Sequence, residues 1–268
     1  MNSNKIILST SDLSIGYQSK KGKNTIAENL NLTFEEGKLV SLVGANGIGK
    51  STLLRTLSGI QKPLTGSVFL NDKDIYFTDK LTLAQNLSLV LTDKLPPSNL
   101  TVFELIALGR QPYTNWLGKL SEDDFQKINH AVALTRTEHL LDKKHHEISD
   151  GQLQIVLIAR ALAQNTPLII LDEPTTHLDL QHKISVFKLL KKLSQETNKC
   201  ILFSTHDIDL AIQLSDEMIV MTENNVFQNQ PCNLISQGVF NTLFNDDSIS
   251  FDGLKGKFVL LNSEIKNR

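Results

Sequence analysis

The chain has 268 residues, 40% of them hydrophobic, enough to bury the core of one large α/β domain or two small ones. A formal net charge of -2 gives no basic surface, which disfavours nucleic acid as the main ligand. Two cysteines, Cys200 in an apolar run and Cys232 in a polar one, favour a reducing compartment over a disulfide framework. Since no apolar run approaches the length of a membrane span, we expect any membrane attachment to come through a partner.

The first part of the chain, up to about Phe77, has the pattern of short strands separated by turns. Turn signals occur at Glu35-Glu36-Gly37 and at Asn71-Asp72. Apolar and β-branched runs between such signals predict strands at 5–10, 29–34, 39–43 and 66–70. This part is therefore expected to be mostly β.

Residues 44–52 match the phosphate-binding loop pattern G-x-x-x-x-G-K-[ST] at every fixed position. A strand-like run precedes them and a helical pattern follows, which is the context that the motif requires and that a chance glycine-rich turn lacks. We expect the glycines to allow positive φ, so that backbone N–H groups converge on phosphate oxygens. Lys50 is expected to reach the β- and γ-phosphates and Ser51 to hold Mg²⁺. The nucleotide-binding candidates are Gly44, Asn46, Gly47, Gly49, Lys50, Ser51 and Thr52.

The rest of the chain changes pattern twice. A strand is predicted at 87–91, and helical spacing then dominates from Thr101 to Ala163, which indicates an inserted helical subdomain. Apolar strands return at 168–171 and 200–203, separated by an amphipathic helix at 182–196. This strand, helix, strand order predicts a parallel sheet.

Two carboxylates, Asp172 and Glu173, directly follow the strand at 168–171. Ligands collect at the carboxyl ends of strands in open α/β sheets, so this position suits a metal and a water. We expect Asp172 to organise Mg²⁺ and Glu173 to polarise the water that attacks the γ-phosphate. The alternative is a charged turn after a buried strand, and the phosphate-binding loop upstream argues against it.

Further polar segments stand at element boundaries. Residues 148–152 open a helix predicted at 153–163, so the Ser149 hydroxyl and neighbouring N–H groups are expected to form a second anion site. The segment 176–179 follows Glu173 closely. His206 follows the strand at 200–203, where it either contacts the γ-phosphate or serves as an ordinary structural histidine.

These pieces stand in the order found in ATP-binding cassette (ABC) ATPases, which the chain resembles over essentially its whole length. The resemblance implies a P-loop NTPase (RecA-like) α/β core with an N-terminal antiparallel β subdomain and an inserted α-helical subdomain. It implies one ABC ATPase domain over 1–268, with core and β subdomain in 1–92 and 164–268 and the helical subdomain in 93–163. It also implies ATP and Mg²⁺ as cofactors and a head-to-tail homodimer.

The resemblance assigns roles to individual residues. Ser149, Gly151 and Gln152, with Asp179 of the D-loop, would lie over the nucleotide held by the other subunit. The implied catalytic residues are Lys50, Glu173 and His206, and the implied metal ligands are Ser51, Asp172 and Asp93. Tyr17 resembles the aromatic residue that stacks on adenine, and the alternative is a tyrosine on the surface of an early strand.

One cassette without a membrane span resembles the separate ATPase subunit of a bacterial importer, bound to an integral-membrane permease on the cytoplasmic face of the cell membrane. The segment 100–113, with a Gly-Arg-x-Pro turn, resembles the subgroup that serves iron-siderophore, haem and cobalamin permeases. A substrate-binding protein would then be an indirect partner. Tyr113, Trp116 and Leu117 either pack within the helical subdomain or face the permease.

Two positions depart from the family pattern. Asp150 replaces a glycine of the signature, which places a carboxylate near a polyphosphate, and Asp93 stands where a Q-loop glutamine is expected, unless it is a solvated turn residue before Pro96-Pro97. These departures keep open a degenerate cassette that binds ATP and regulates or assembles without turnover. A soluble ABC ATPase for cluster assembly or DNA repair is disfavoured by the short helical insert and the absence of a long coiled-coil pattern.

Overall fold

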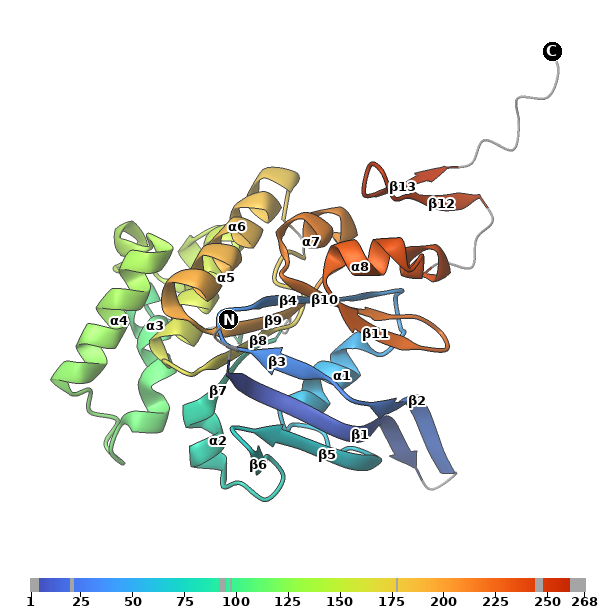
Figure 1. The fold of residues 1–268 in the computed structure, drawn as a ribbon. Coiled ribbons are helices and arrows are strands. Elements are labelled where there is room, and N and C mark those ends of the chain that lie inside the picture. Colours follow the sequence, from blue (N-terminus) through green and yellow to red (C-terminus); the bar gives the residue numbers. More distant parts are fainter. Residues whose placement is uncertain are drawn as a thin grey trace, which may run out of the picture.

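The computed structural model describes residues 5–19, 22–91, 95–96, 98–176, 178–243 and 248–260. Within these residues a six-stranded sheet forms the centre, an antiparallel sheet lies on one side of it, and helices cover the other side (Figure 1). This arrangement confirms the expected α/β P-loop architecture.

The central sheet has the strand order β11-β10-β4-β9-β8-β7, and all neighbours are parallel except β10 and β11. Every residue of β4, β8 and β9 is buried, as expected for apolar strands covered on both faces. The predicted strands at 39–43, 87–91, 168–171 and 200–203 are therefore confirmed. The observed bounds are β4 (Leu39–Gly44), β7 (Leu87–Val90), β8 (Leu168–Leu171), β9 (Cys200–Ser204), β10 (Glu217–Met221) and β11 (Val226–Asn229).

Alternate residues of these strands enter two separate cores. Leu39 and Val43 of β4 face the core shared with the helices, whereas Val40 and Leu42 face the antiparallel sheet. Helix α1 (Lys50–Leu57) supplies Leu53, Leu54 and Leu57 to the second core, so it lies between the two sheets (Figure 1). The helix that begins at the phosphate-binding loop is thus fixed on both sides.

The antiparallel sheet has the order β2-β1-β5-β6, and β3 also pairs with β1. Its strands are β1 (Ile6–Ser19), β2 (Gly22–Leu30), β3 (Thr33–Glu35), β5 (Thr65–Leu70) and β6 (Lys73–Asp74), and α2 (Lys80–Asn86) follows. The prediction of one strand at 29–34 is wrong. Asn29 has a φ of 55°, and Thr10 Oγ1 donates to Leu30 O (2.7 Å) and accepts from Leu32 N (2.8 Å), which fixes a break between β2 and β3.

The described α-helices between β7 and β8 begin with reciprocal caps. Thr101 with Glu104, Ser121 with Asp124 and Ser149 with Gln152 each form a capping box. Because Ser149 is the N-cap, the predicted start of the last helix at Leu153 is wrong and the helix begins at Asp150. The elements are α3 (Val102–Ala107), η1 (Leu108–Tyr113), α4 (Glu122–Thr135), η2 (Glu138–Leu140), η3 (His145–Glu147) and α5 (Asp150–Ala163).

A buried arginine ties these helices together. Arg110, in η1, donates from Nε to Asp124 Oδ1 (2.7 Å) in α4 and from a guanidinium nitrogen to Ala163 O (2.9 Å) at the end of α5. Its guanidinium carbon also lies 3.9 Å from the centre of the Tyr113 ring. A side chain at Gly109 would place its Cβ 2.2 Å from Arg160 O, so η1 approaches α5 closely. The Gly-Arg-x-Pro turn therefore anchors the helical region.

The remaining elements cover the central sheet or follow it in the chain. The helices are α6 (Leu180–Thr197), α7 (Ile208–Leu214), α8 (Pro231–Ser236) and η4 (Val239–Thr242), and the strands are β12 (Ile249–Asp252) and β13 (Lys257–Leu260). The hairpin of β12 and β13 is attached by aromatic contacts, because Phe251 packs on Phe240 and Phe258 with ring centroids 4.7 and 5.1 Å apart. Among the described residues, no helix combines the length and the apolar character needed to cross a membrane.

Candidate active site

The phosphate-binding loop connects β4 to α1 and owes its course to three glycines. Gly47 and Gly49 have φ values of 76° and 113°, which L-residues with a side chain rarely adopt. Gly44 does not have a positive φ, so our expectation for it is wrong. Its role is close approach, since a Cβ at Gly44 would lie 2.7 Å from Met221 O of the neighbouring strand β10. Asn46 and Gly47 lie exposed at the tip of the loop.

Lys50, the first residue of α1, extends back along the loop. Its Nζ donates to Gly44 O (3.0 Å) and Ala45 O (3.1 Å), and the residue is only 6% exposed. Burial lowers the pKa of Lys50, and the negative charges of Glu173 and Asp172 act in the opposite direction. The ammonium group therefore lies inside the loop and faces the two carboxylates at the end of β8.

Asp172 lies between the loop and the neighbouring strand β9. Its Oδ1 accepts a hydrogen bond from Ser204 Oγ (2.6 Å) and lies 3.4 Å from Ser51 Oγ. The order β4-β9-β8 places the carboxyl ends of these strands at one edge, which brings together residues more than a hundred positions apart. The same Ser204 hydroxyl accepts from Glu173 N (2.8 Å), so this serine links the Asp172 carboxylate to the Glu173 backbone.

Glu173 is held in an unusual conformation beside His206. Its φ is 48°, a region that costs a residue with a side chain free energy. Thr176 Oγ1 donates to Oε2 (2.9 Å), and His206 Nε2 lies 2.7 Å from Oε1. Burial would raise the pKa of Glu173, but the hydrogen bonds from Thr176 and His206 outweigh it and leave the pKa below its ordinary value. The carboxylate is therefore ionised and oriented at neutral pH.

Further polar contacts fix the segments around Glu173 and His206. Thr175 Oγ1 donates to Asp207 Oδ2 (3.0 Å), and Lys183 Nζ of α6 donates to Asp207 Oδ1 (2.8 Å). No role was predicted from the sequence for Ser204, Thr176 or Asp207, although Thr176 begins the segment 176–179 and the other two lie within two positions of His206. Their place near the ends of β8 and β9 was the available signal.

Tyr17 lies near the end of β1, next to the first helical turn of α1. Its hydroxyl is 2.8 Å from Thr52 Oγ1, and the residue is 48% exposed. Thr52 itself is buried. The structure thus brings the predicted adenine-stacking residue to the loop, with about half of its surface exposed.

Another group of predicted residues gathers at the start of α5. Ser149 Oγ accepts from Gln152 N (3.3 Å), and Gln152 Oε1 accepts from Ser149 N (3.1 Å). Asp150 is exposed in the first turn, whereas Gly151 is buried. The two ends of the capping box are therefore satisfied by each other, and Asp150 places an acidic residue in the first turn of the helix.

Asp179 caps α6 close to this group. Its two carboxylate oxygens contact the backbone N (2.9 Å) and Nδ1 (2.8 Å) of His182. Gly151 connects the two helix starts, because a Cβ there would lie 3.2 Å from His182 Cδ2 and 3.6 Å from Leu178 Cδ2. The predicted D-loop and signature residues thus meet at one place. Asp93, predicted as a metal ligand, lies outside the described residues.

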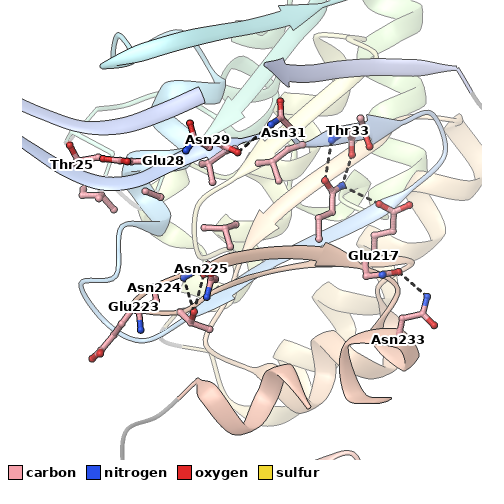
Figure 2. A pocket seen from close by; sticks show the side chains of 18 of the residues that line it. Thr25, Glu28, Asn29, Asn31, Thr33, Glu217, Glu223, Asn224, Asn225 and Asn233 are labelled. Carbon is pink, nitrogen blue, oxygen red and sulfur yellow. Dashed lines mark hydrogen bonds between the residues drawn. The ribbon is translucent and has the colours of Figure 1, made fainter. Parts of the chain in front are cut away.

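A cavity of about 1090 Å³ lies apart from these residues, between the β2–β3 segment and the β10–β11 hairpin. Figure 2 shows Asn29 and Asn31 on one side of it and Asn224 and Asn225 on the other. Gln228 crosses its end, accepting from Thr33 N (3.0 Å) and donating to Thr33 O and Glu217. None of the predicted site residues that the structure describes lines this cavity, so it is separate from the phosphate-binding loop.

Comparisons with known proteins find relatives over most of the chain. Residues 27–176 match the family model described as ABC transporter. An uncharacterised ABC transporter ATP-binding protein of Methanocaldococcus jannaschii is 39% identical over 98% of this chain and 89% of its own length. The iron(3+)-hydroxamate import ATP-binding protein FhuC of Bacillus subtilis is 38% identical over 82% of this chain and 81% of its own length.

A solved structure gives the same result for the fold. The structure of cbiO1 from Clostridium perfringens, part of the ABC transporter complex cbiONQ, superposes with a TM-score of 0.76. The match covers 88% of this chain and 92% of cbiO1, at 30% sequence identity. The similarity therefore extends over the sheets as well as the loop.

Proposed function

We propose a function for this chain on the basis of its family. The chain belongs to the ABC transporter family as an ATP-binding subunit. The proposal is that ATP closes a homodimer of this subunit on a separate permease, and that hydrolysis reopens it to power uptake of an iron-siderophore, haem or cobalamin. The observation that carries the hydrolytic part is the arrangement of Lys50, Asp172, Glu173 and His206 around the end of β4, β8 and β9.

The chemistry assigned to the site is phosphoryl transfer from ATP to water. Lys50 would contact the β- and γ-phosphates, because its ammonium group already lies among the loop carbonyls. Glu173, ionised and held by Thr176 and His206, would accept a proton from the water and orient it. His206 would link the γ-phosphate to Glu173, since its ring contacts that carboxylate directly.

Mg²⁺ fits the oxygen atoms between the loop and β8. Ser51 Oγ and Asp172 Oδ1 are 3.4 Å apart, and hydroxyl and carboxylate oxygens are the hard ligands that Mg²⁺ prefers. One or two protein ligands are enough for this ion when phosphates and waters complete the shell. When bound, it would neutralise charge that develops on the phosphates. Ser51 and Asp172 would hold it, and Ser204 would keep Asp172 in place.

The proposed dimer rests on the residues at the starts of α5 and α6. Ser149, Gly151, Gln152 and Asp179 belong to helix starts, where N–H groups and the helix dipole favour anions. We assign them to the nucleotide bound by the other subunit, as in the family that the chain resembles. ATP would then join two subunits, and loss of the γ-phosphate would separate them.

A permease partner is supported by exposed apolar side chains beside the helical region. Leu81 of α2, Leu108 of η1, and Trp116 and Leu117 beyond η1 are 56%, 46%, 91% and 67% exposed. Side-chain contacts join α2 and η1, because Gln85 Nε2 donates to Pro112 O (3.1 Å). Such a surface suits a peripheral protein on the cytoplasmic face of a membrane, bound through its partner. The substrate-binding protein would contact the permease and not this chain.

The substrate class rests on the relatives. The Bacillus subtilis relative is named for iron(3+)-hydroxamate import, and the Gly-Arg-x-Pro turn of that subgroup is used here as an anchor for the helices. The relatives favour a transporter subunit over a degenerate cassette or a soluble ABC ATPase.

The test is reconstitution. The tagged chain is purified from membranes with its permease, placed in liposomes with the substrate-binding protein, and supplied with radioactive ferric hydroxamate. We expect phosphate release and iron uptake, both lost in Glu173→Gln. Failure to copurify a polytopic membrane protein would contradict the transporter role, and coupled phosphate release without iron uptake would contradict the substrate class alone.

A further inference from the structure

His182 lies between the two motifs that meet at the starts of α5 and α6. Its backbone N donates to Asp179 Oδ1 (2.9 Å), and its Nδ1 lies 2.8 Å from Asp179 Oδ2. Asp179 is exposed, and the hydrogen bonds from the backbone and side chain of His182 lower its pKa. An ionised carboxylate accepts only, so Nδ1 carries the proton and donates. The imidazole is thus fixed in one orientation by the residue that caps its own helix.

The other edge of the same ring lies over Gly151. A Cβ at Gly151 would come 3.2 Å from His182 Cδ2, which is tighter than ordinary van der Waals contact, and 3.6 Å from Cγ, which is an ordinary contact. Gly151 is buried although it stands in the first turn of α5. A side chain at this position would therefore press on the ring, and the glycine lets the ring lie close to the start of α5.

The position before Gly151 is different in character. Asp150 is exposed, it begins the helix, and a carboxylate is favourable in the first turn. The signature segment of this chain thus joins an exposed carboxylate to a buried glycine that lies close to the His182 ring.

We propose that His182 is a positioning residue that holds the D-loop and the signature segment of one subunit together as one surface for the second subunit. The inference rests on the proposed ATP-dependent dimer. These contacts of His182 are not with the phosphate-binding loop of its own subunit. Its hydrogen bonds go to Asp179, and its ring lies against Gly151. His182 would fix the position of the start of α5 relative to the start of α6, and both helix starts would contact the nucleotide bound by the second subunit.

The experiment measures ATP-driven dimerisation in the Glu173→Gln background by analytical ultracentrifugation, together with ATP affinity of the monomer. His182→Ala should raise the dimer dissociation constant about tenfold or more, because each dimer loses two such links. ATP affinity and the melting temperature of the monomer should stay unchanged. His182→Phe keeps the ring without the donor, and His182→Asn keeps a donor without the ring, so each should fall between Ala and His. Gln181→Ala, an exposed neighbour on the same helix, is the matched control.

The outcomes separate this inference from the proposed function. If the Glu173→Gln chain with His182 intact does not dimerise with ATP, the proposed function fails first. If it dimerises and His182→Ala dimerises equally well, the role of His182 is refuted while the function stands. A fall in melting temperature or in monomer ATP affinity that accounts for the whole effect would mean that His182 only stabilises the fold.

Discussion

The phosphate-binding region and the signature region of this chain are built in opposite ways. Around the loop, Lys50 and Asp172 are buried, and the Asp172 and Glu173 carboxylates are tied to neighbouring segments by hydrogen bonds from Ser204, Thr176 and His206. Around the starts of α5 and α6, Ser149, Asp150, Asp179 and His182 are exposed, and their contacts stay within the group.

The difference shows how one chain can hold a nucleotide and still depend on a second copy. Buried, bonded groups lose little entropy when they meet a ligand, which suits residues that handle phosphate and water. Exposed groups at helix starts are available to another surface. Changes at Glu173, Thr176 and Asp150 test this comparison, and a change at Arg110 tests the effect of burial on a bonded charge elsewhere in the chain.

The largest effect is expected at Glu173. Glu173→Gln keeps the shape of the side chain but cannot accept a proton, so turnover should fall about 10²- to 10⁴-fold. ATP should still bind, and an ATP-bound dimer should accumulate. Phosphate release and gel filtration with ATP measure both. Glu223→Gln, an exposed carboxylate beside the polar cavity, should keep normal turnover. Near-normal turnover in Glu173→Gln would show that Glu173 is not the general base.

The second effect is on stability, through the arginine that joins η1, α4 and the end of α5. Arg110→Ala leaves the Asp124 carboxylate buried without its partner, and should cost about 3 kcal/mol or more of unfolding free energy. Asp123→Asn is the matched control, because Asp123 is exposed and 3.7 Å from Arg110, where an ion pair is worth about 1 kcal/mol or less. Urea unfolding distinguishes the two. Equal losses would mean that burial does not decide the strength of this link.

The pH dependence of this ion pair follows from Asp124. Burial alone would raise its pKa, but hydrogen bonds from Ser121 and Arg110 leave the pKa below the ordinary value of 3.8. A carboxyl whose pKa is lower in the folded chain than in the unfolded chain stabilises the fold at pH values above its unfolded pKa. The difference between wild type and Arg110→Ala should therefore be complete at neutral pH and shrink as the pH falls below about 4.

The third effect is a shift in pH profile. Thr176 donates to Glu173 and lowers its pKa, so Thr176→Ala should raise that pKa and move the acid limb of kcat/KM to higher pH. Thr176→Ser keeps the donor and should keep the wild-type limb. Because the pKa of Glu173 is already below 4.5, the turnover measurements must extend from neutral pH down to about pH 4. If Ala and Ser give the same limb, the hydroxyl does not tune Glu173.

The smallest effect is expected at Asp150, whose charge would lie near the phosphates bound by the second subunit. Asp150→Gly should raise ATP-dependent dimer affinity or turnover by about two- to fivefold, the size of one screened Coulomb repulsion at close range. Asp150→Asn removes the charge while it keeps the helix start, and should give a similar gain. Unchanged or lower values in both variants would show that the carboxylate points away or is needed.

Local patterns were sufficient for much of the site. The glycine spacing before Lys50, the carboxylates after β8 and the histidine after β9 are contiguous with strands whose apolar runs are readable in the sequence. Because parallel strands place their carboxyl ends at one edge, such residues can be predicted to meet without knowing the strand order in detail. The strand, helix, strand order was readable for the same reason.

Other features depend on contacts that no local pattern contains. The reason for Gly44 is the backbone of Met221, and the break between β2 and β3 is set by Thr10, twenty residues away from its partner Leu30. Ser204 is an ordinary serine in the sequence and becomes the bridge between Asp172 and Glu173 only when β9 lies beside β8.

The sequence by itself determined the nucleotide-binding chemistry of this protein, because a phosphate is bound by consecutive residues at the junction of one strand and one helix. Only the tertiary structure decided how the signature and D-loop are connected. That connection is a histidine ring packed on a glycine thirty-one positions earlier, and its existence depends on how α5 and α6 start beside each other. Contacts of this kind are fixed by the packing of whole elements, so they carry no signal in residue spacing.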